Sequence, residues 1–399
     1  MMGSAAFGSE PTTLQDKLRV LAARQAAFRS ETQRAQLGEA LSRARLGEAL
    51  ITVLADRARL TQIARDALWD SYLSRVSALA RPDRRNRVRR LVERLLVRGG
   101  TPGRALILAR SGVWRSAASN GSARSAIESY VRAGADPAAQ PAALFDQSGY
   151  LASNPTLAGS RLSPLLHHLV YGSSEGPSPH PLFDAAYYKS AALGDLEATG
   201  LSPLAHYIRV GAGRGFSPHP LFDPRHYVAQ APDLVGSDET PLEHYLRVGS
   251  DRDLSPHLLF QPAYYRAQLP LEARDQNLLL HYLRQGSGEG LKPHPLFDPI
   301  WYREHYDDLG AQEPLAHFVA IGGGQLRNPG PWFDSVVYAQ TAGEARAKNL
   351  DPLSDYLAGG AWKVGELAAG LHLSAYLVAH PELALSGLTP LEHWALAAG

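Results

Sequence analysis

Residues 222–249 read FDPRHYVAQAPDLVGSDETPLEHYLRVG, and this stretch decides the fold because the chain repeats it. Its halves, Phe-Asp-x-x-x-Tyr and Pro-Leu-x-His-aromatic-apolar with a following Gly, recur through residues 141–399. A sequence period of 36 to 39 residues, by subtraction of the starting positions, is typical of stacked helical hairpins. The first half starts at Phe145, Phe183, Phe222, Phe260, Phe297, Phe333 and Leu371. We therefore expect seven copies of one helical-hairpin unit.

The recurring residues of the first half match the beginning of a helix. Asp184 stands where an N-cap carboxylate accepts the free amides of the first turn. Pro224 and Pro299 stand at the first helical position. Phe183 and Tyr188 flank the cap at the spacing of a hydrophobic staple. We assign these structural roles in the best-formed copies to Phe183, Asp184, Tyr188, Phe222, Asp223, Tyr227, Phe297, Asp298 and Tyr302.

Each Pro-Leu-x-His segment predicts a second short helix. Leu204 and Ile208 would share one face, whereas His206 and Val210 would lie nearly opposite. Since a helix that is apolar on both sides is sandwiched, we expect it between its hairpin partner and the next repeat, as in an α-solenoid. The expected N-caps are Ser163, Ser202, Thr240, Asp351 and Thr389. The glycines expected to end these helices as C-caps are Gly211, Gly249 and Gly322.

The chain before the repeats has three predicted parts. Residues 1–11 are small and polar, and we expect them to be disordered. Residues 12–80 have the composition of helices, and their irregular apolar spacing leaves two alternatives open. One is a helical hairpin that docks on the repeats, and the other is a coiled coil that forms a homo-oligomer or binds a partner. Residues 81–140 read as a basic helix followed by a degenerate capping repeat at 126–134. The predicted class is all-α, an α-solenoid of about seven repeats after a long helical region.

One basic cluster lies within residues 81–98, although the net charge of the chain is only +1. One interpretation is a face that contacts the anionic headgroups of a membrane. The other is the solvated side of an amphipathic helix. Nucleic acid is not an expected partner, because no aromatic residue is interleaved in this segment. The candidate contacts to an anionic surface are Arg84, Arg85, Arg87, Arg89 and Arg90.

Composition excludes several classes of site. The chain has no cysteine, which excludes disulfides, thiolate zinc sites, iron–sulfur clusters and a cysteine nucleophile. No secretory leader is evident, and no apolar run approaches the ~20 residues that span a bilayer. We expect a cytoplasmic protein, with peripheral association at the inner membrane as an option. No nucleotide-binding fingerprint or nucleophile elbow is present. We therefore expect no cofactor and no catalytic residue.

The helical histidines recur once per unit, as at His206, His244 and His317. A metal site needs several ligands within about 2 Å of the ion, whereas neighbouring copies lie a full repeat apart. We therefore expect no metal site. Our interpretation is a partly buried histidine that bonds a nearby backbone group or Asp and holds the repeat interface. The linker histidines, in contrast, are expected to be exposed; they are His180, His219, His257 and His294.

Two further sets of recurring side chains suggest a ligand-binding groove. Aromatic residues next to the staple tyrosine are available to stack on sugar rings. Arginines three residues after the helical histidine lie near helix C-termini, where the helix dipole favours cations. Stacked along the repeats, these arginines would bind an anionic glycan or phosphate, although favourable capping also explains them. The candidate ligand-binding residues are Tyr187, Tyr264, Trp301, Arg209, Arg247 and Arg284.

The run from Phe222 to Phe260, with Pro232-Asp233-Leu234 between its halves, resembles a tandem repeat of bacterial glycosyltransferase-associated proteins. Those proteins are tied to surface-polysaccharide assembly, and their repeats flank catalytic domains rather than perform catalysis. The Ala/Leu/Arg-rich leader is similar to theirs. The resemblance implies a non-catalytic scaffold whose partners are glycan-synthesis enzymes. A carbohydrate-binding module and an accessory region of a glycosyltransferase remain alternatives; an enzymatic activity, if present, would be glycosyl transfer.

Overall fold

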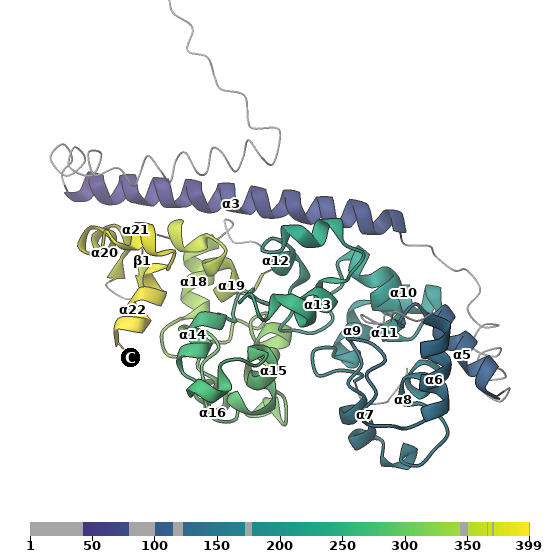
Figure 1. Cartoon of the computed structure of the whole chain (residues 1–399). Helices are drawn as coiled ribbons and strands as arrows, with labels where there is room; N and C mark the ends of the chain where they lie inside the picture. Colours follow the sequence, from purple (N-terminus) through teal and green to yellow (C-terminus); the bar gives the residue numbers. More distant parts are fainter. Residues whose placement is uncertain are drawn as a thin grey trace, which may run out of the picture. The chain divides into compact units, whose positions relative to one another are not determined.

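The described residues are mostly helical, which confirms the predicted all-α class (Figure 1). The described strands are a short antiparallel ribbon of β1 (Glu366–Ala368) and β2 (Leu371–His372). The computed structural model describes residues 43–79, 100–114, 123–171, 178–343, 350–364, 366–368 and 371–398.

The chain forms two compact units, and the repeats contribute to both. One unit comprises the described residues within 1–68, 295–310 and 318–399. The other comprises the described residues within 69–294 and 311–317. The same helical hairpin recurs in each unit, so the contacts of one copy are representative of the others.

The first helix begins as predicted in the five copies that have the Asp, whereas Gln261 and His372 make no capping bond in the other two. The Asp184 carboxylate accepts the backbone N–H groups of Ala186 and Tyr187, each at 2.9 Å. The rings of Phe183 and Tyr188 lie 5.2 Å apart and are fully buried, which is the contact of a hydrophobic staple. These first helices are α7 (Gln147–Ser153), α9 (Ala185–Ala191), α12 (Pro224–Val228), α14 (Pro262–Ala267), α16 (Pro299–His305), α18 (Ser335–Ala342) and α20 (Leu373–Ala379).

The second helix starts with an α-helical turn, which a side chain caps in most copies. Thr240 and Glu243 form a complete capping box at one of these helices. Ser163 occupies the cap position, but its hydroxyl makes no bond to the helix, so its predicted capping bond is wrong. The second helices are α8 (Pro164–Val170), α11 (Pro203–His206), α13 (Pro241–His244), α15 (Leu278–His281), α17 (Pro314–His317), α19 (Pro352–Leu357) and α22 (Pro390–Ala398).

Four of these helices continue into a five-residue π-helical turn that the sequence period did not reveal. The π-helical turns are η2 (Tyr207–Gly211), η5 (Tyr245–Gly249), η7 (Tyr282–Gly286) and η9 (Phe318–Gly322). Shorter elements join the two helices of a repeat or follow the second one. They are η1 (Pro155–Leu157), α10 (Leu193–Thr199), η3 (Ala212–Arg214), η4 (Pro232–Gly236), η6 (Leu271–Ala273), η8 (Asp307–Leu309), η11 (Gly360–Trp362) and α21 (Leu383–Ser386).

Each π-helical turn ends at the recurring glycine, but this glycine is not a left-handed C-cap, so that predicted role is wrong. Gly211 has the right-handed φ of −66°, and the chain continues through it. A Cβ atom on Gly211 would lie 1.8 Å from the hydroxyl oxygen of Tyr188. The glycine is required because the tyrosine hydroxyl occupies that space. Equivalent distances of 1.9 to 2.1 Å occur at Gly249, Gly286, Gly322 and Gly360.

The left-handed residue that ends the helical run comes four positions after this glycine. Its φ is 79° at Gly215 and Gly290, 56° at Asp253 and 59° at Leu326. Glycine adopts this conformation at no steric cost, and Asp tolerates it, whereas a leucine there is strained. The left-handed stop therefore lies four residues after the recurring glycine, and it is a glycine only at Gly215 and Gly290.

The same tyrosine hydroxyl bonds the helical histidine, and we call this Tyr–His–Gly arrangement the tyrosine lock. Tyr227 Oη lies 2.6 Å from Nδ1 of His244, with Gly249 beside it. In the copy that has Asp355 instead of histidine, Tyr338 donates to the carboxylate at 2.7 Å. The other bonded pairs span 2.6 to 3.0 Å; they are Tyr150–His167, Tyr188–His206, Tyr265–His281 and Tyr376–His393.

The lock changes the interpretation of the helical histidine. The expected partner was a backbone group or Asp at the interface between repeats. The main partner is instead the tyrosine of the same repeat, so the histidine joins the two helices of its own hairpin. His244 also has Nε2 3.3 Å from Asp233 Oδ2, so the expected Asp partner is present as a second contact.

Successive repeats are joined through backbone bonds and a second tyrosine. The N–H of Asp184 donates to the carbonyl of Pro218 in the next linker at 2.9 Å, and four other copies make the same bond at 2.7 to 3.1 Å. The Tyr356 hydroxyl accepts the N–H of Leu391, at the start of the next second helix, at 3.1 Å. Tyr356 therefore completes the N-terminus of a helix in the following repeat.

The degenerate copy before the first full repeat makes the same link. It forms α6 (Ala123–Ala133), which packs on α5 (Gly100–Ser111). The hydroxyl of Tyr130 accepts the N–H of Leu165 at 3.1 Å and donates to Gln147. The assignment of this copy as an N-terminal capping repeat stays a prediction.

The described part of the leader is one continuous helix, α3 (Arg43–Leu79) (Figure 1). In the unit that contains the last repeats, Arg57 donates to the carbonyl of Ala384 at 2.8 Å. In the other unit, Trp69 leaves no room for a Cβ atom on Gly215, the nearest distance being 2.8 Å. Within each unit α3 therefore packs on repeats, and the helical-hairpin alternative for residues 12–80 stays a prediction. Residues 1–42 lie outside the described residues, and the coiled-coil alternative stays a prediction.

We predict that Gly249→Ala destabilises the chain by about 1–3 kcal/mol, because the new methyl group overlaps the Tyr227 hydroxyl. Urea denaturation followed by circular dichroism measures this change. Combining it with Tyr227→Phe, which removes the overlapping oxygen, should recover part of the loss. Gly236→Ala is the matched control, since no atom lies within 4 Å of the added carbon. Equal stability of the two alanine variants would contradict the lock.

Candidate functional site

The aromatic residues proposed for sugar stacking already have neighbours. Tyr187 is half-buried, and burial raises its pKa, while Ser217 of the next linker acts in the opposite direction through a hydrogen bond. Trp301 stacks on His305 with ring centroids 3.8 Å apart, so one face is covered. Tyr264 is half-buried as well. The open aromatic platform that the sequence suggested is therefore reduced.

The three candidate arginines have separate partners rather than one shared ligand position. Arg247 forms a bidentate pair with Glu239 at 2.6 and 2.7 Å. Arg284 lies 3.5 Å from Asp146 of the first repeat. The stem of Arg209 lies 3.1 Å from the Cβ position of Gly112. Their regular spacing in the sequence does not give them a common role.

The linker histidines are buried, so the prediction that they are exposed is wrong. The exposed fractions are 9% at His180, 7% at His219 and His257, and 0% at His294. In three copies Nδ1 accepts the N–H of the leucine two residues later, at 3.0 to 3.1 Å, so the ring folds back onto its own turn. The N-cap Asp of the same repeat also interacts electrostatically with this ring. Asp184, for example, acts to raise the pKa of His219. Sequence reasoning missed this because flanking prolines made the segment read as an open linker.

The basic segment of residues 81–98, with Arg84, Arg85, Arg87, Arg89 and Arg90, lies outside the described residues. The proposed contact with an anionic surface therefore stays a prediction. The nearby Arg104 is described, and it donates to the carbonyl of Arg161 at 2.8 Å. No described helix is both long and apolar enough to cross a membrane.

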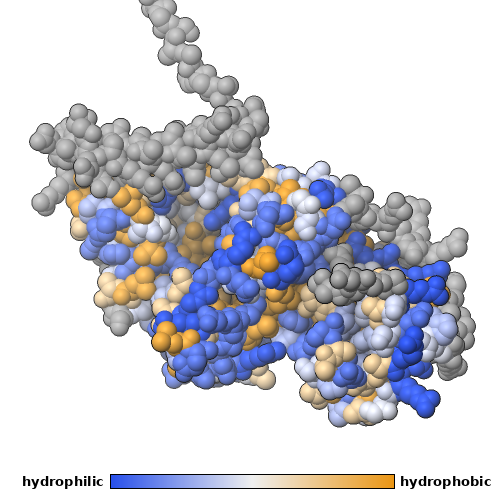
Figure 2. Space-filling view, viewed as in Figure 1, coloured by the Kyte–Doolittle hydropathy of each residue, from blue (hydrophilic) through white to orange (hydrophobic). Residues whose placement is uncertain are grey.

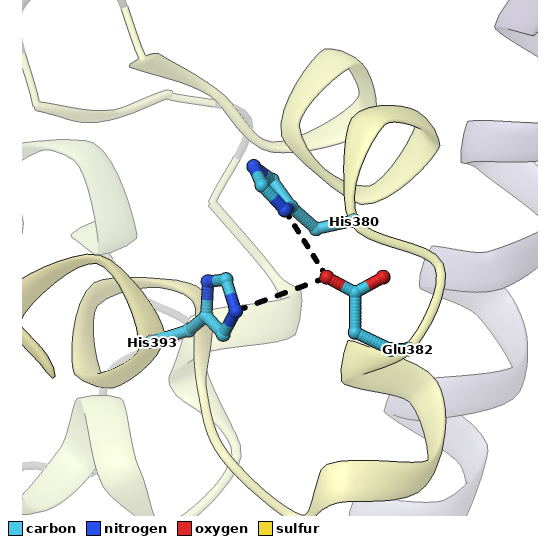
Figure 3. Close-up of side chains that lie close together, drawn as sticks. All are labelled: His380, Glu382 and His393. Carbon is cyan, nitrogen blue, oxygen red and sulfur yellow. Dashed lines mark hydrogen bonds and ion pairs between the residues drawn. The ribbon is translucent and has the colours of Figure 1, made fainter. Parts of the chain in front are cut away.

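The last repeat brings together three side chains that can act as ligands: His380, Glu382 and His393 (Figure 3). Glu382 Oε1 lies 3.1 Å from His380 Nδ1 and 3.8 Å from His393 Nε2. The donor atoms all lie within 4.8 Å of one another. His380 follows α20, Glu382 precedes α21 and His393 lies on α22, so three segments of one repeat meet here. The expectation that no ligating side chains converge is wrong for this copy.

The repeat frame explains how this cluster arises. In the third copy, the helical His244 faces Asp233 of the Pro-Asp-Leu segment. The last copy keeps this pair as His393 and Glu382, and it places His380 where the third copy has Ala231. The signal was therefore visible as His-Pro-Glu in place of Ala-Pro-Asp. The series of helical histidines does not reveal it, because the three donors lie within a single repeat.

The surroundings of the cluster favour a charged carboxylate and a fixed ring. The pKa of Glu382 is lowered, first by a hydrogen bond from its own backbone N–H and then by His380. Tyr376 Oη lies 2.8 Å from Nδ1 of His393, so Nε2 faces Glu382. The exposed fractions of the side chains are 38% for His380, 59% for Glu382 and 24% for His393. Solvent therefore reaches the cluster.

We predict that the chain loses stability as the pH falls from 6.5 towards 4. Burial lowers the pKa of four histidines to about 4, whereas their unfolded-state value is about 6.5; they are His168, His180, His206 and His219. Between pH 6.5 and pH 4 these histidines are protonated in the unfolded chain but largely neutral in the folded chain. The unfolded state therefore binds more protons, and acid favours unfolding. Each histidine contributes at most roughly 1.4 kcal/mol per pH unit. A urea midpoint that is constant between pH 7 and pH 5 would refute this account.

The matched control for this pH dependence is His305→Gln, which changes an exposed histidine. Its urea midpoint should follow the same curve against pH as that of the unaltered chain. If His305→Gln removed the acid sensitivity, the buried histidines would not be its source.

The chain matches no family model, no curated protein and no solved structure. The resemblance of its repeat to that of glycosyltransferase-associated proteins is therefore a prediction, and function has to be argued from the described residues.

Proposed function

We propose that the chain is a non-catalytic scaffold of helical repeats that binds enzymes of bacterial surface-polysaccharide synthesis. The observation that supports it most strongly is the use of the repeat's reactive side chains within the fold. The tyrosine and helical histidine bond each other, as Tyr227 and His244 do at 2.6 Å. The Asp caps its helix, and the linker histidine closes its own turn. What recurs is therefore structural, and little of it is left for catalysis.

The proposed architecture is an α-solenoid in which each repeat rests on the next. The backbone bond from the N-cap Asp to the following linker and the Tyr356–Leu391 contact support it. In the unit that holds the first four repeats, Asp146 of the first copy reaches Arg284 of the fourth. This pair supports a superhelix in which copies three apart come close. Solenoids of this kind expose variable side chains on a regular frame, which suits partner binding.

The exposed positions of the first helices differ between copies, as a partner-specific surface requires. Ile300 is 52% exposed, Val336 44% and Val337 48%, within one unit. The residues that correspond to Ile300 in earlier copies are Ala186, Arg225 and Ala263, all exposed and small or polar. Figure 2 shows apolar residues in small groups among hydrophilic ones on the visible face. We assign the apolar positions of the fifth and sixth copies to contact with the partner, since exposed apolar groups often mark interaction sites.

The partner class comes from the resemblance of the repeat, which points to glycosyltransferases. The test uses the purified full chain and purified glycosyltransferases encoded beside its gene, with binding measured by biolayer interferometry. We expect saturable binding that the double change Ile300→Glu and Val336→Glu weakens at least tenfold, because it buries charge in an apolar contact. The matched control is Ala186→Glu with Ala263→Glu, at the corresponding positions of earlier copies, which should leave affinity unchanged.

Other outcomes would overturn the proposal. Absence of binding to these enzymes, together with glycan-array binding that Tyr264→Ala weakens, would favour the carbohydrate-binding alternative. Turnover of a sugar nucleotide by the purified chain would show an enzyme instead. Equal loss of binding in the control variant would remove the assigned surface.

A further inference from the structure

We propose that His380, Glu382 and His393 bind one Zn²⁺ ion in the last repeat. The inference rests on the geometry of this cluster and does not depend on the proposed scaffold function. Two imidazoles and one carboxylate are a donor set that suits zinc, whereas magnesium and calcium prefer oxygen ligands alone.

The distances between the donors fit a single ion. Zinc bonds to histidine nitrogen and carboxylate oxygen at about 2.0–2.2 Å, so tetrahedral donors lie about 3.3 Å apart. Glu382 Oε1 lies 3.1 Å from His380 Nδ1 and 3.8 Å from His393 Nε2, one below and one above this value. The two imidazole rings have centroids 4.9 Å apart. Small rotations of side chains that are partly exposed would close the remaining difference.

The tyrosine lock gives this site its outer support. Tyr376 Oη lies 2.8 Å from Nδ1 of His393. With the metal on Nε2, the ring carries its proton on Nδ1 and donates it to the tyrosine oxygen. Histidine ligands almost always donate their second ring nitrogen in this way, which fixes the tautomer and the ring orientation. A contact that is structural in the other repeats would thus orient a ligand here.

The third copy shows why the same pair does not make a site elsewhere. There Arg252 donates to Asp233 Oδ2 at 2.7 Å, while His244 Nε2 lies 3.3 Å from the same oxygen. A guanidinium therefore occupies the position that an ion would take. The third donor is also absent, because Ala231 stands in place of His380. The last copy supplies that donor.

The site would be open on one side. Glu382 is 59% exposed and His380 38%, so a water molecule can complete the tetrahedron. The ligands come from the ends of α20 and α21 and from α22, so the ion would tie three segments of the repeat together. An ion that binds the folded chain and not the unfolded chain raises the free energy of unfolding.

The test is isothermal titration of ZnCl₂ into the untagged, chelator-treated full chain. We expect one site per chain with a Kd in the micromolar range or below, and a higher melting temperature with zinc than with chelator. His380→Ala and Glu382→Gln should each weaken this site at least tenfold, because each removes a ligand. Tyr376→Phe should weaken it about tenfold through loss of the outer hydrogen bond.

Two controls separate this site from general effects. His305→Ala removes an exposed histidine of the same unit and should leave zinc affinity unchanged. Tyr227→Phe breaks the lock of the third copy and should also leave it unchanged. The proposal is overturned if no saturable site is found, if only several weak sites appear, or if His380→Ala binds as tightly as the unaltered chain. Equal weakening by Tyr227→Phe and Tyr376→Phe would likewise overturn it.

Discussion

The fold depends on a buried phenol group that must find a partner inside a short helix. Tyr227 is fully buried, and its hydroxyl would cost about 1–3 kcal/mol if it were left without a hydrogen bond. His244 Nδ1 supplies the partner, and Gly249 supplies the space. The helix that carries both is too short to be stable alone. The Tyr–His bond therefore joins two helices that neither propensity nor length would maintain.

The rest of each repeat follows from this arrangement. Once the lock fixes the hairpin, the Asp cap and the Phe–Tyr staple fix how the chain enters it. The linker histidine then closes the turn that leads to the next Phe, as His219 does for Phe222. Each recurring side chain is used by its own repeat or by the adjacent one. Variation is therefore concentrated at exposed positions, such as the one held by Ile300 and Val336.

The cap and the staple could be predicted from the sequence because they are local and have fixed spacing. The copy number and the hairpin form were predictable for the same reason. The tyrosine lock was not predictable. Tyr227 and His244 are 17 residues apart, and the repeat period does not show which residues lie close together in space. Gly249 was assigned to the commonest role of glycine, since nothing in the sequence marks a close approach. The linker histidines were misplaced because prolines usually indicate exposed segments.

The candidate site illustrates the same limit at a smaller scale. His393 belongs to the regular series, whereas His380 and Glu382 appear only when one repeat is compared position by position with another. The third copy has Ala231 at the His380 position and the fifth has Tyr306, so neither supplies an imidazole there. The residues that could bind a ligand in this chain are therefore those that depart from the repeat, and not the ones that recur in every copy. The same reasoning selects the apolar positions proposed to meet a partner.

The most direct test of this account is a double-mutant cycle on Tyr227 and His244, with stability measured by urea denaturation of Tyr227→Phe, His244→Leu and the combined variant. If the hydroxyl and the imidazole hold the hairpin together, the two changes should couple by at least about 1 kcal/mol. Additive effects, within about 0.3 kcal/mol, would show that the two side chains act independently and would contradict the central role of the lock.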